Sequence, residues 1–108
     1  MQILDYRDLP LASRVHAADH LRDAQATLAG SDDILVDLGG NLATTSWVDG
    51  FLVPVARKLV SAGGIAIVSD SDLTRAHLVR VFSSRGLKAR VARTRSDALT
   101  GQFDILPS

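Results

Sequence analysis

The sequence predicts an α/β domain with a mostly parallel or mixed sheet of four or five strands and about four helices. Short apolar runs, which are typical of buried strands, alternate along the chain with longer segments whose apolar residues recur at helical spacing. The length of 108 residues suits one core, because a chain of about 100 residues buries roughly two-thirds of its unfolded surface. We therefore expect a single domain over residues 1–108.

The first predicted elements are a strand over residues 2–6 and a helix over residues 14–29. Pro10 follows the strand and cannot donate a hydrogen bond to a sheet, so it marks the strand's end. Ser13 is a suitable N-cap for the helix, and Gly30 is the residue type that favours a left-handed C-cap. Together these residues predict the first strand-helix unit.

The second unit begins with the apolar run over residues 34–38, which has no helical period and reads as a central strand. A helix then starts near residues 44–46 and runs to Ala62, where Gly63 follows. Pro54 lies inside this helix and lacks the N–H that would bond to Gly50. We expect one helix with a bend.

Two further units complete the pattern. Residues 65–69 predict a second buried strand, and Asp70, Ser71 and Asp72 supply caps for a helix that ends at Gly86. Residues 87–93 alternate between apolar and basic side chains, which indicates a half-exposed strand near a sheet edge. Thr94 begins a short last helix, and residues 103–106 predict an extended tail.

The helix that ends at Ala62 has an unusual outer side. Its inner arc is long enough to pack on the sheet, and its members are Trp47, Val48, Phe51, Leu52, Val55, Leu59 and Ala62. On the opposite side, Val53, Ala56 and Val60 form an apolar strip beside Ser46 and Asp49. Such a strip is either covered by a neighbouring helix or exposed as a partner-binding surface.

Several short motifs in this region resemble a known family. Val36-Asp37-Leu38-Gly39-Gly40, followed by Ser46 at the start of an apolar helix, resembles the STAS domain of anti-sigma factor antagonists. Leu11-Ala12-Ser13-Arg14 and Ser46-Trp47-Val48-Asp49 are more similar to the STAS-like family of unknown function. In the antagonist motif, Thr45, Trp47 and Val48 stand where that family has Asp, Ser and Gly.

The resemblance implies a non-catalytic regulatory module rather than an enzyme. Its partner would be an anti-sigma factor or a serine kinase of the histidine-kinase-like ATPase type, bound through the helix over residues 46–62 and the loop before it. The partner-binding residues would then be Ser46, Asp49, Val53, Ala56 and Val60. Ser46 matches the serine that the partner kinase phosphorylates in the antagonists.

The hydroxyl groups of Thr44, Thr45 and Ser46 allow three interpretations that the residues alone leave open. They can cap the helix that follows. They can accept a phosphate, which the first turn of a helix accommodates and whose charge would alter partner binding. They can also bind a free anion, so a phosphotransfer or anion-binding domain is the alternative function.

The formal net charge is zero, but the charges are unevenly distributed. Residues 1–54 hold three basic and eight acidic side chains, whereas residues 55–108 hold nine basic and four acidic ones. Arg85, Lys88, Arg90 and Arg93 are the basic residues near the predicted edge strand. They could contact nucleic acid or an acidic protein, or discourage edge pairing. We do not expect a dedicated nucleic-acid binder, because no aromatic residues are interleaved with them.

Other residue patterns exclude several classes of site. There is no cysteine, and neither nucleotide-binding fingerprint is present, so we expect no metal and no cofactor. His16 and His20 share a helix face and are expected at the surface, and His77 at the core boundary. No signal peptide or membrane span is evident, which predicts a cytoplasmic protein. A homodimer is a further expectation.

Overall fold

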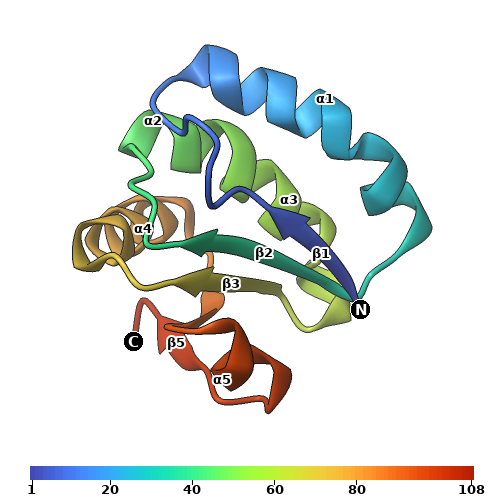
Figure 1. The fold of residues 1–108 in the computed structure, drawn as a ribbon, viewed down its shortest axis with the longest axis vertical. Helices are drawn as coiled ribbons and strands as arrows, with labels where there is room; N and C mark the ends of the chain where they lie inside the picture. Colours follow the sequence, from blue (N-terminus) through green and yellow to red (C-terminus); the bar gives the residue numbers. More distant parts are fainter.

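The computed structural model describes residues 1–108, apart from the side chain of Ala62, and contains one mixed five-stranded sheet (Figure 1). The strands are β1 (Gln2–Asp5), β2 (Ile34–Gly39), β3 (Ile65–Ser69), β4 (Ala89–Ala92) and β5 (Asp104–Leu106). They lie side by side in chain order; β1 to β4 are parallel and β5 is antiparallel to β4. The predicted fold class is confirmed.

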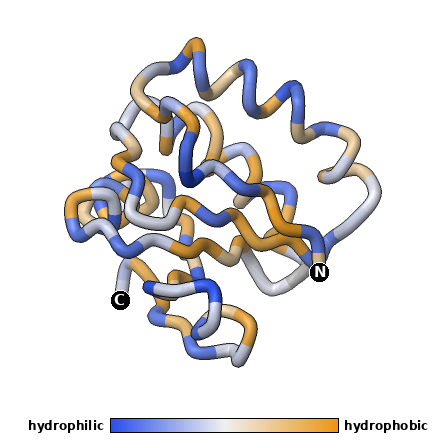
Figure 2. Tube along the Cα trace, viewed as in Figure 1, coloured by the Kyte–Doolittle hydropathy of each residue, from blue (hydrophilic) through white to orange (hydrophobic). Residues whose placement is uncertain are grey.

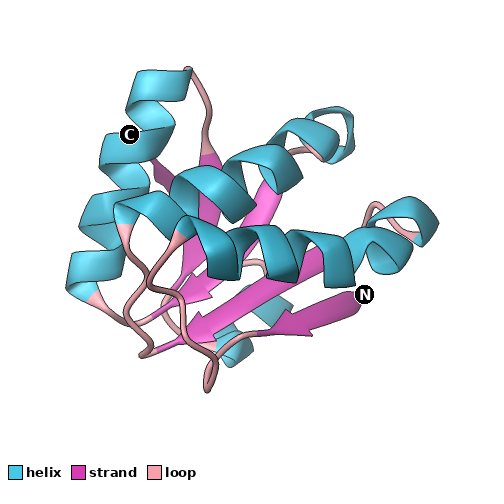
Figure 3. Ribbon diagram, turned by 90° about the horizontal axis from the view of Figure 1, so that it is seen from above, coloured by secondary structure: helices cyan, strands magenta, loops and turns pink.

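The helices cover the two faces of the sheet unequally (Figures 1 and 3). The three crossover connections between the parallel strands all lead to the adjacent strand in the same direction across the sheet. Because such connections are right-handed, their helices lie on one face. The short helix near the C-terminus packs on β3 and β4 from the other face. The helical elements are α1 (Arg14–Gly30), α2 (Thr45–Trp47), η1 (Val48–Leu52), α3 (Val53–Lys58), η2 (Val60–Ala62), α4 (Asp72–Arg85) and α5 (Arg95–Leu99).

The hydrophobic core follows this arrangement. The larger cluster fills the space between the sheet and its three-helix face, and its largest side chains are Trp47, Phe51 and Phe82. A smaller cluster lies under α5 and includes Leu35 and Val68. The central strands β2 and β3 are predominantly hydrophobic (Figure 2) and buried along nearly their whole length, as expected for parallel strands that are covered on both faces.

The second predicted helix is a composite of α2, η1 and α3. The element η1 is a π-helical turn, and the N–H of Val53 donates to the carbonyl of Val48, five residues back. Pro54 follows at once, and its missing N–H accounts for the disturbed hydrogen bonding at this place. At the place where the sequence predicted a bend, the structure therefore has a π-helical turn just before Pro54. Six of the side chains predicted for the inner arc are buried: Trp47, Val48, Phe51, Leu52, Val55 and Leu59. The seventh, that of Ala62, lies outside the part of the chain that the structure describes.

The apolar strip of this helix is not a continuous exposed surface. Val53 and Ala56 are each only 2% exposed and belong to the same core cluster as Leu78 and Val81 of α4. Their assignment as partner-binding residues is wrong, because both side chains are enclosed in the core and offer no exposed surface. Val60 is 61% exposed and alone remains available.

The strand predicted over residues 87–93 is not at the edge of the sheet. Residues 104–106 form β5 beside it, so β4 is paired on both sides. The guanidinium of Arg90 is half-buried and lies 5.4 Å from the ring centroid of Phe103, and its Nη2 donates to the carbonyl of Gly64 at 2.9 Å. No helix in the described part of the chain combines the length and apolarity needed to cross a membrane.

Candidate functional site

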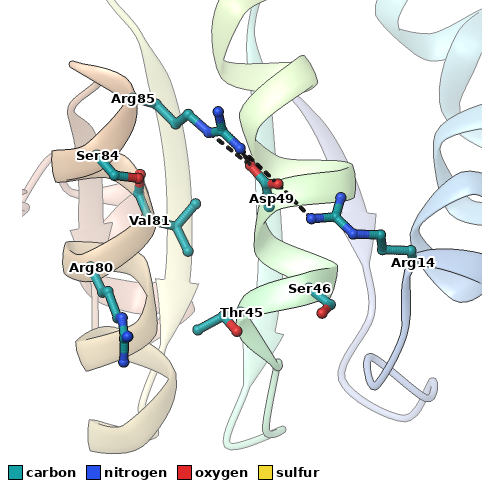
Figure 4. A pocket seen from close by; sticks show the side chains of 8 residues that line it. All are labelled: Arg14, Thr45, Ser46, Asp49, Arg80, Val81, Ser84 and Arg85. Carbon is teal, nitrogen blue, oxygen red and sulfur yellow. Dashed lines mark hydrogen bonds and ion pairs between the residues drawn. The ribbon is translucent and has the colours of Figure 1, made fainter.

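A pocket of about 240 Å³ lies between the start of α1, the α2–η1 segment and the second half of α4 (Figure 4). Three arginines and one aspartate dominate its lining, and we call it the arginine pocket. Its residues are Arg14, Thr45, Ser46, Asp49, Arg80, Val81, Ser84 and Arg85.

Local capping interactions bring the starts of α1 and α2 together. The Oγ of Ser13 accepts a hydrogen bond from the N–H of His16 and fixes the first turn of α1. The Oγ1 of Thr44 caps α2 by accepting from the N–H of Trp47. The N–H of Thr44 donates to the carbonyl of Leu11 at 3.0 Å. The loop before α1 is thus bonded to the loop before α2.

Close packing of α1 on η1 then places the arginine of α1 beside the aspartate of η1. Gly50 permits this approach, because a Cβ at this position would lie 2.8 Å from the Cβ of Ala17. On the opposite side of η1, Arg85 is the last residue of α4, and Gly86 ends that helix in a left-handed conformation with φ of 66°. Arg14 and Arg85 consequently approach Asp49 from two different helices.

Asp49 links the two arginines. Its Oδ2 accepts from Nη2 of Arg14 at 2.8 Å, and its two oxygens accept from Nε and Nη2 of Arg85 at 3.0 and 2.9 Å (Figure 4). The Asp49 side chain is only 15% exposed, whereas those of Arg14 and Arg85 are 66% and 45% exposed. The hydrogen bond from Arg14 and then that from Arg85 lower the pKa of Asp49, so this carboxylate is ionised at neutral pH.

The remaining polar groups of the pocket are less engaged. Arg80 is exposed and makes no hydrogen bond or ion pair with any described residue. The hydroxyl groups of Thr45 and Ser46 have no hydrogen-bond partner in the part of the chain that the structure describes. Ser84 donates to the carbonyl of Val81 at 2.8 Å. With three guanidinium groups against one carboxylate, the arginine pocket carries two net positive charges.

The structure brings together four residues that the sequence singled out: Thr45, Ser46, Asp49 and Arg85. Thr44 does not line the pocket. Its hydroxyl instead caps α2, in agreement with the capping interpretation. Arg14 and Arg80 were not predicted as site residues. The Ser13-Arg14 motif could have indicated Arg14 as a site residue. Arg80 can be assigned to the pocket only when the position of α4 beside α2 is known.

The other predicted basic residues do not extend the pocket into one basic surface. Arg93 lies beyond the opposite end of β4 from Arg85, with Nη2 3.0 Å from Asp72 and Nη1 3.6 Å from Asp70. Arg90 is half-buried against Phe103 and Gly64, as described above. Lys88 is exposed in the turn before β4. These residues therefore do not form one basic surface: Arg85 lines the arginine pocket, Arg90 packs on Phe103, and Arg93 pairs with Asp70 and Asp72.

Two of the three histidines, His20 and His77, have hydrogen-bond partners, whereas the buried Nδ1 of His16 has none among the described residues. The Nδ1 of His20 accepts from Nε1 of Trp47 at 2.9 Å, and burial lowers the pKa of His20, with the neighbouring His16 contributing in the same direction. The expectation of a surface residue is wrong for His20. The Nδ1 of His77 lies 2.8 Å from a backbone carbonyl, which agrees with a boundary histidine. Among the described residues, no group of three or more potential ligands could hold a metal ion.

A second charge network lies at the carboxyl ends of β1 and β2. The Oδ2 of Asp37 accepts from Nε of Arg95 at 2.8 Å, and its Oδ1 accepts from the N–H of Gly39 at 2.9 Å. Arg7 donates from Nε and Nη2 to Asp5 at 2.9 and 2.7 Å. Since two carboxylates face two guanidinium groups, this network is balanced in charge. We regard it as an anchor for α5 and for the loop after β1.

Comparisons with protein-family models, with curated proteins and with solved structures gave no match to this chain. The arginine pocket is therefore interpreted from its own chemistry.

Proposed function

We propose that this chain is a non-catalytic regulatory module that binds a protein partner through the arginine pocket. The observation that carries the proposal is the meeting of two short motifs far apart in the sequence. Ser13-Arg14 and Ser46-Trp47-Val48-Asp49 are joined by the 2.8 Å hydrogen bond from Arg14 to Asp49. Trp47 and Val48 serve the core, but the core does not need Arg14, which remains 66% exposed.

The exposed charges of the pocket suit recognition of an acidic group. Arginine side chains that are held in place but still exposed lose little further rotamer freedom on binding, and their forked donors match carboxylate and phosphate oxygens. An excess of two positive charges would also speed the encounter with a negatively charged surface. By the resemblance to anti-sigma factor antagonists, the partner would be an anti-sigma factor or a histidine-kinase-like ATPase.

Ser46 is the candidate for regulation of this binding. Its hydroxyl lines the pocket and is free of hydrogen bonds among the described residues. A phosphate on Ser46 would add up to two negative charges and compete with an acidic partner for the arginines. Within the proposal, Ser46→Asp weakens partner binding and Ser46→Ala does not; equal affinity of the two variants would remove Ser46 from the regulatory role.

Two arginines of α1 provide a matched test of the proposal. Arg14 and Arg22 are both exposed, at 66% and 72%, and both place Nη2 2.8 Å from an aspartate, but only Arg14 lines the pocket. Partner capture from the native host should be lost with Arg14→Glu and retained with Arg22→Glu, while circular dichroism shows both variants folded. Capture that is retained by both variants, or lost by both, would contradict the proposal.

A further inference from the structure

We propose that the arginine pocket recognises a phosphate monoester carried by the partner, such as a phosphoserine or phosphothreonine side chain. The inference rests on the proposed function, because it identifies the chemical group by which the partner is bound. Three features of the pocket support it: the charge excess, the donors that remain free, and the fixed positions of two of the three arginines.

The charge of the pocket corresponds to a dianion. Arg14, Arg80 and Arg85 contribute three positive charges and Asp49 removes one. A phosphate monoester carries about −1.5 to −2 at pH 7, whereas a glutamate or aspartate side chain carries only −1. The phosphate thus neutralises the pocket, and a carboxylate leaves one guanidinium charge without a counter-charge.

Free donors remain on all three arginines. Arg14 uses only Nη2 for Asp49, and Arg85 uses only Nε and Nη2. Arg80 uses none of its nitrogens within the described residues. The hydroxyl groups of Thr45 and Ser46 add two more potential donors. A phosphate offers three acceptor oxygens and no obligatory donor, so it matches a pocket whose unused groups are predominantly donors.

Asp49 gives this pocket its preorganisation. By accepting from both Arg14 and Arg85, it holds two long side chains beside the pocket, which Arg80 lines from α4 at some distance from this pair (Figure 4). Side chains fixed in advance lose less conformational entropy when a ligand arrives. Arg80 has no partner among the described residues of the free protein, so its interactions form mainly when the ligand binds. It is therefore the best position for a test.

The test uses small probes and the full chain at constant ionic strength. A short peptide with a central phosphoserine is compared with the same peptide containing glutamate or serine, and with inorganic phosphate. Binding is followed by the NMR shifts of the Thr45 and Ser46 amides and by calorimetry. We expect the phosphopeptide to bind more tightly than the other three probes and to shift these amides.

Variants then assign the binding to the pocket. Arg80→Ala should weaken phosphopeptide binding roughly tenfold or more, which is typical for loss of a charge-assisted hydrogen bond, and Arg80→Lys should fall between Arg80→Ala and the wild type. Arg22→Ala, with its arginine outside the pocket, should bind within about twofold of the wild type. Since Arg80 has no partner in the fold, its removal leaves no buried charge unpaired.

Several outcomes would overturn the inference: absence of phosphopeptide binding, equal binding of the glutamate peptide, or equal losses for Arg80→Ala and Arg22→Ala. Tighter binding of inorganic phosphate than of the phosphopeptide would overturn the assignment to a partner-borne group. If no phosphate probe binds while Arg14→Glu still loses a partner that Arg22→Glu retains, the phosphate proposal fails and the proposed function stands.

Discussion

Replacing Asp49 by asparagine separates the electrostatic role of this residue from its shape. The amide occupies nearly the same volume but carries no charge, so it no longer forms ion pairs with Arg14 and Arg85. In the wild type these pairs consist of three hydrogen bonds between 2.8 and 3.0 Å long. The variant therefore measures what the ionic contacts of the arginine pocket contribute to folding.

The exposure of the two arginines sets the size of the effect. Loss of one partner from a fully buried ion pair costs about 3–5 kcal/mol, because the remaining charge stays buried. Here the remaining charges belong to Arg14 and Arg85, which are 66% and 45% exposed and return to water. Exposed pairs contribute about 0.2–1 kcal/mol each, so we expect a loss of about 1 kcal/mol in the free energy of unfolding.

The assay is urea denaturation at pH 7 followed by Trp47 fluorescence. Trp47 is the only tryptophan and is fully buried, so its emission reports the loss of the core. Asp19→Asn is the matched control, because Asp19 is half-exposed and forms a single i,i+3 pair with Arg22. The control should lose at most about 0.5 kcal/mol. A loss above about 3 kcal/mol for Asp49→Asn, or one no larger than the control, would refute this reasoning.

The same comparison has a defined pH dependence. Hydrogen bonds from Arg14 and Arg85 lower the pKa of Asp49 in the folded state, so the carboxylate favours folding wherever the unfolded chain would also be ionised. The difference between wild type and Asp49→Asn should be complete above a pH of about 4 and should shrink as the pH falls through the lower pKa of the folded state. A difference that is unchanged in acid would contradict the assigned cause.

Two further predictions concern the packing around the pocket. Val53→Asp should destabilise the fold by more than about 3 kcal/mol, because Val53 is buried. Val60→Asp should change the free energy of unfolding by less than about 0.5 kcal/mol, because Val60 is exposed. Similar urea midpoints for the two variants would show that the assigned burial is wrong. Burial lowers the pKa of His20, so the unfolded chain binds more protons there and stability should rise with pH up to about 6.5 and then level off. His20→Gln should remove this rise in urea titrations, and a rise that persists in the variant would contradict it.

Local signals in the sequence predicted the helix starts well. Ser13, Ser71 and Thr94 were expected as caps, and each accepts a hydrogen bond from the N–H three residues later. These signals succeed because a cap depends on neighbouring residues only. Continuous apolar runs likewise predicted the central strands β2 and β3, since burial on both faces leaves such a pattern, whereas residues 103–106 were expected only as an extended tail.

The features that the sequence did not predict depend on contacts between distant segments. The burial of Val53 and Ala56 depends on packing between segments distant in the sequence, including that of α4 on α2 and η1, and the sequence gives no register for such contacts. The same packing brings Arg80 to the pocket. Pairing of β5 with β4 depends on the path of the chain after α5, so the edge of the sheet was assigned to the wrong strand.

The sheet order has a consequence for the sequence of assembly. Each of β2, β3 and β4 pairs with the strand that precedes it in the chain, so the sheet can extend one strand at a time as the chain emerges from synthesis. Arg14 and Asp49 belong to the early, acidic half, whereas Arg80 and Arg85 arrive with the late, basic half. The three arginines line one pocket only after α4 has docked. A partner that requires all three would therefore distinguish the finished domain from its nascent forms.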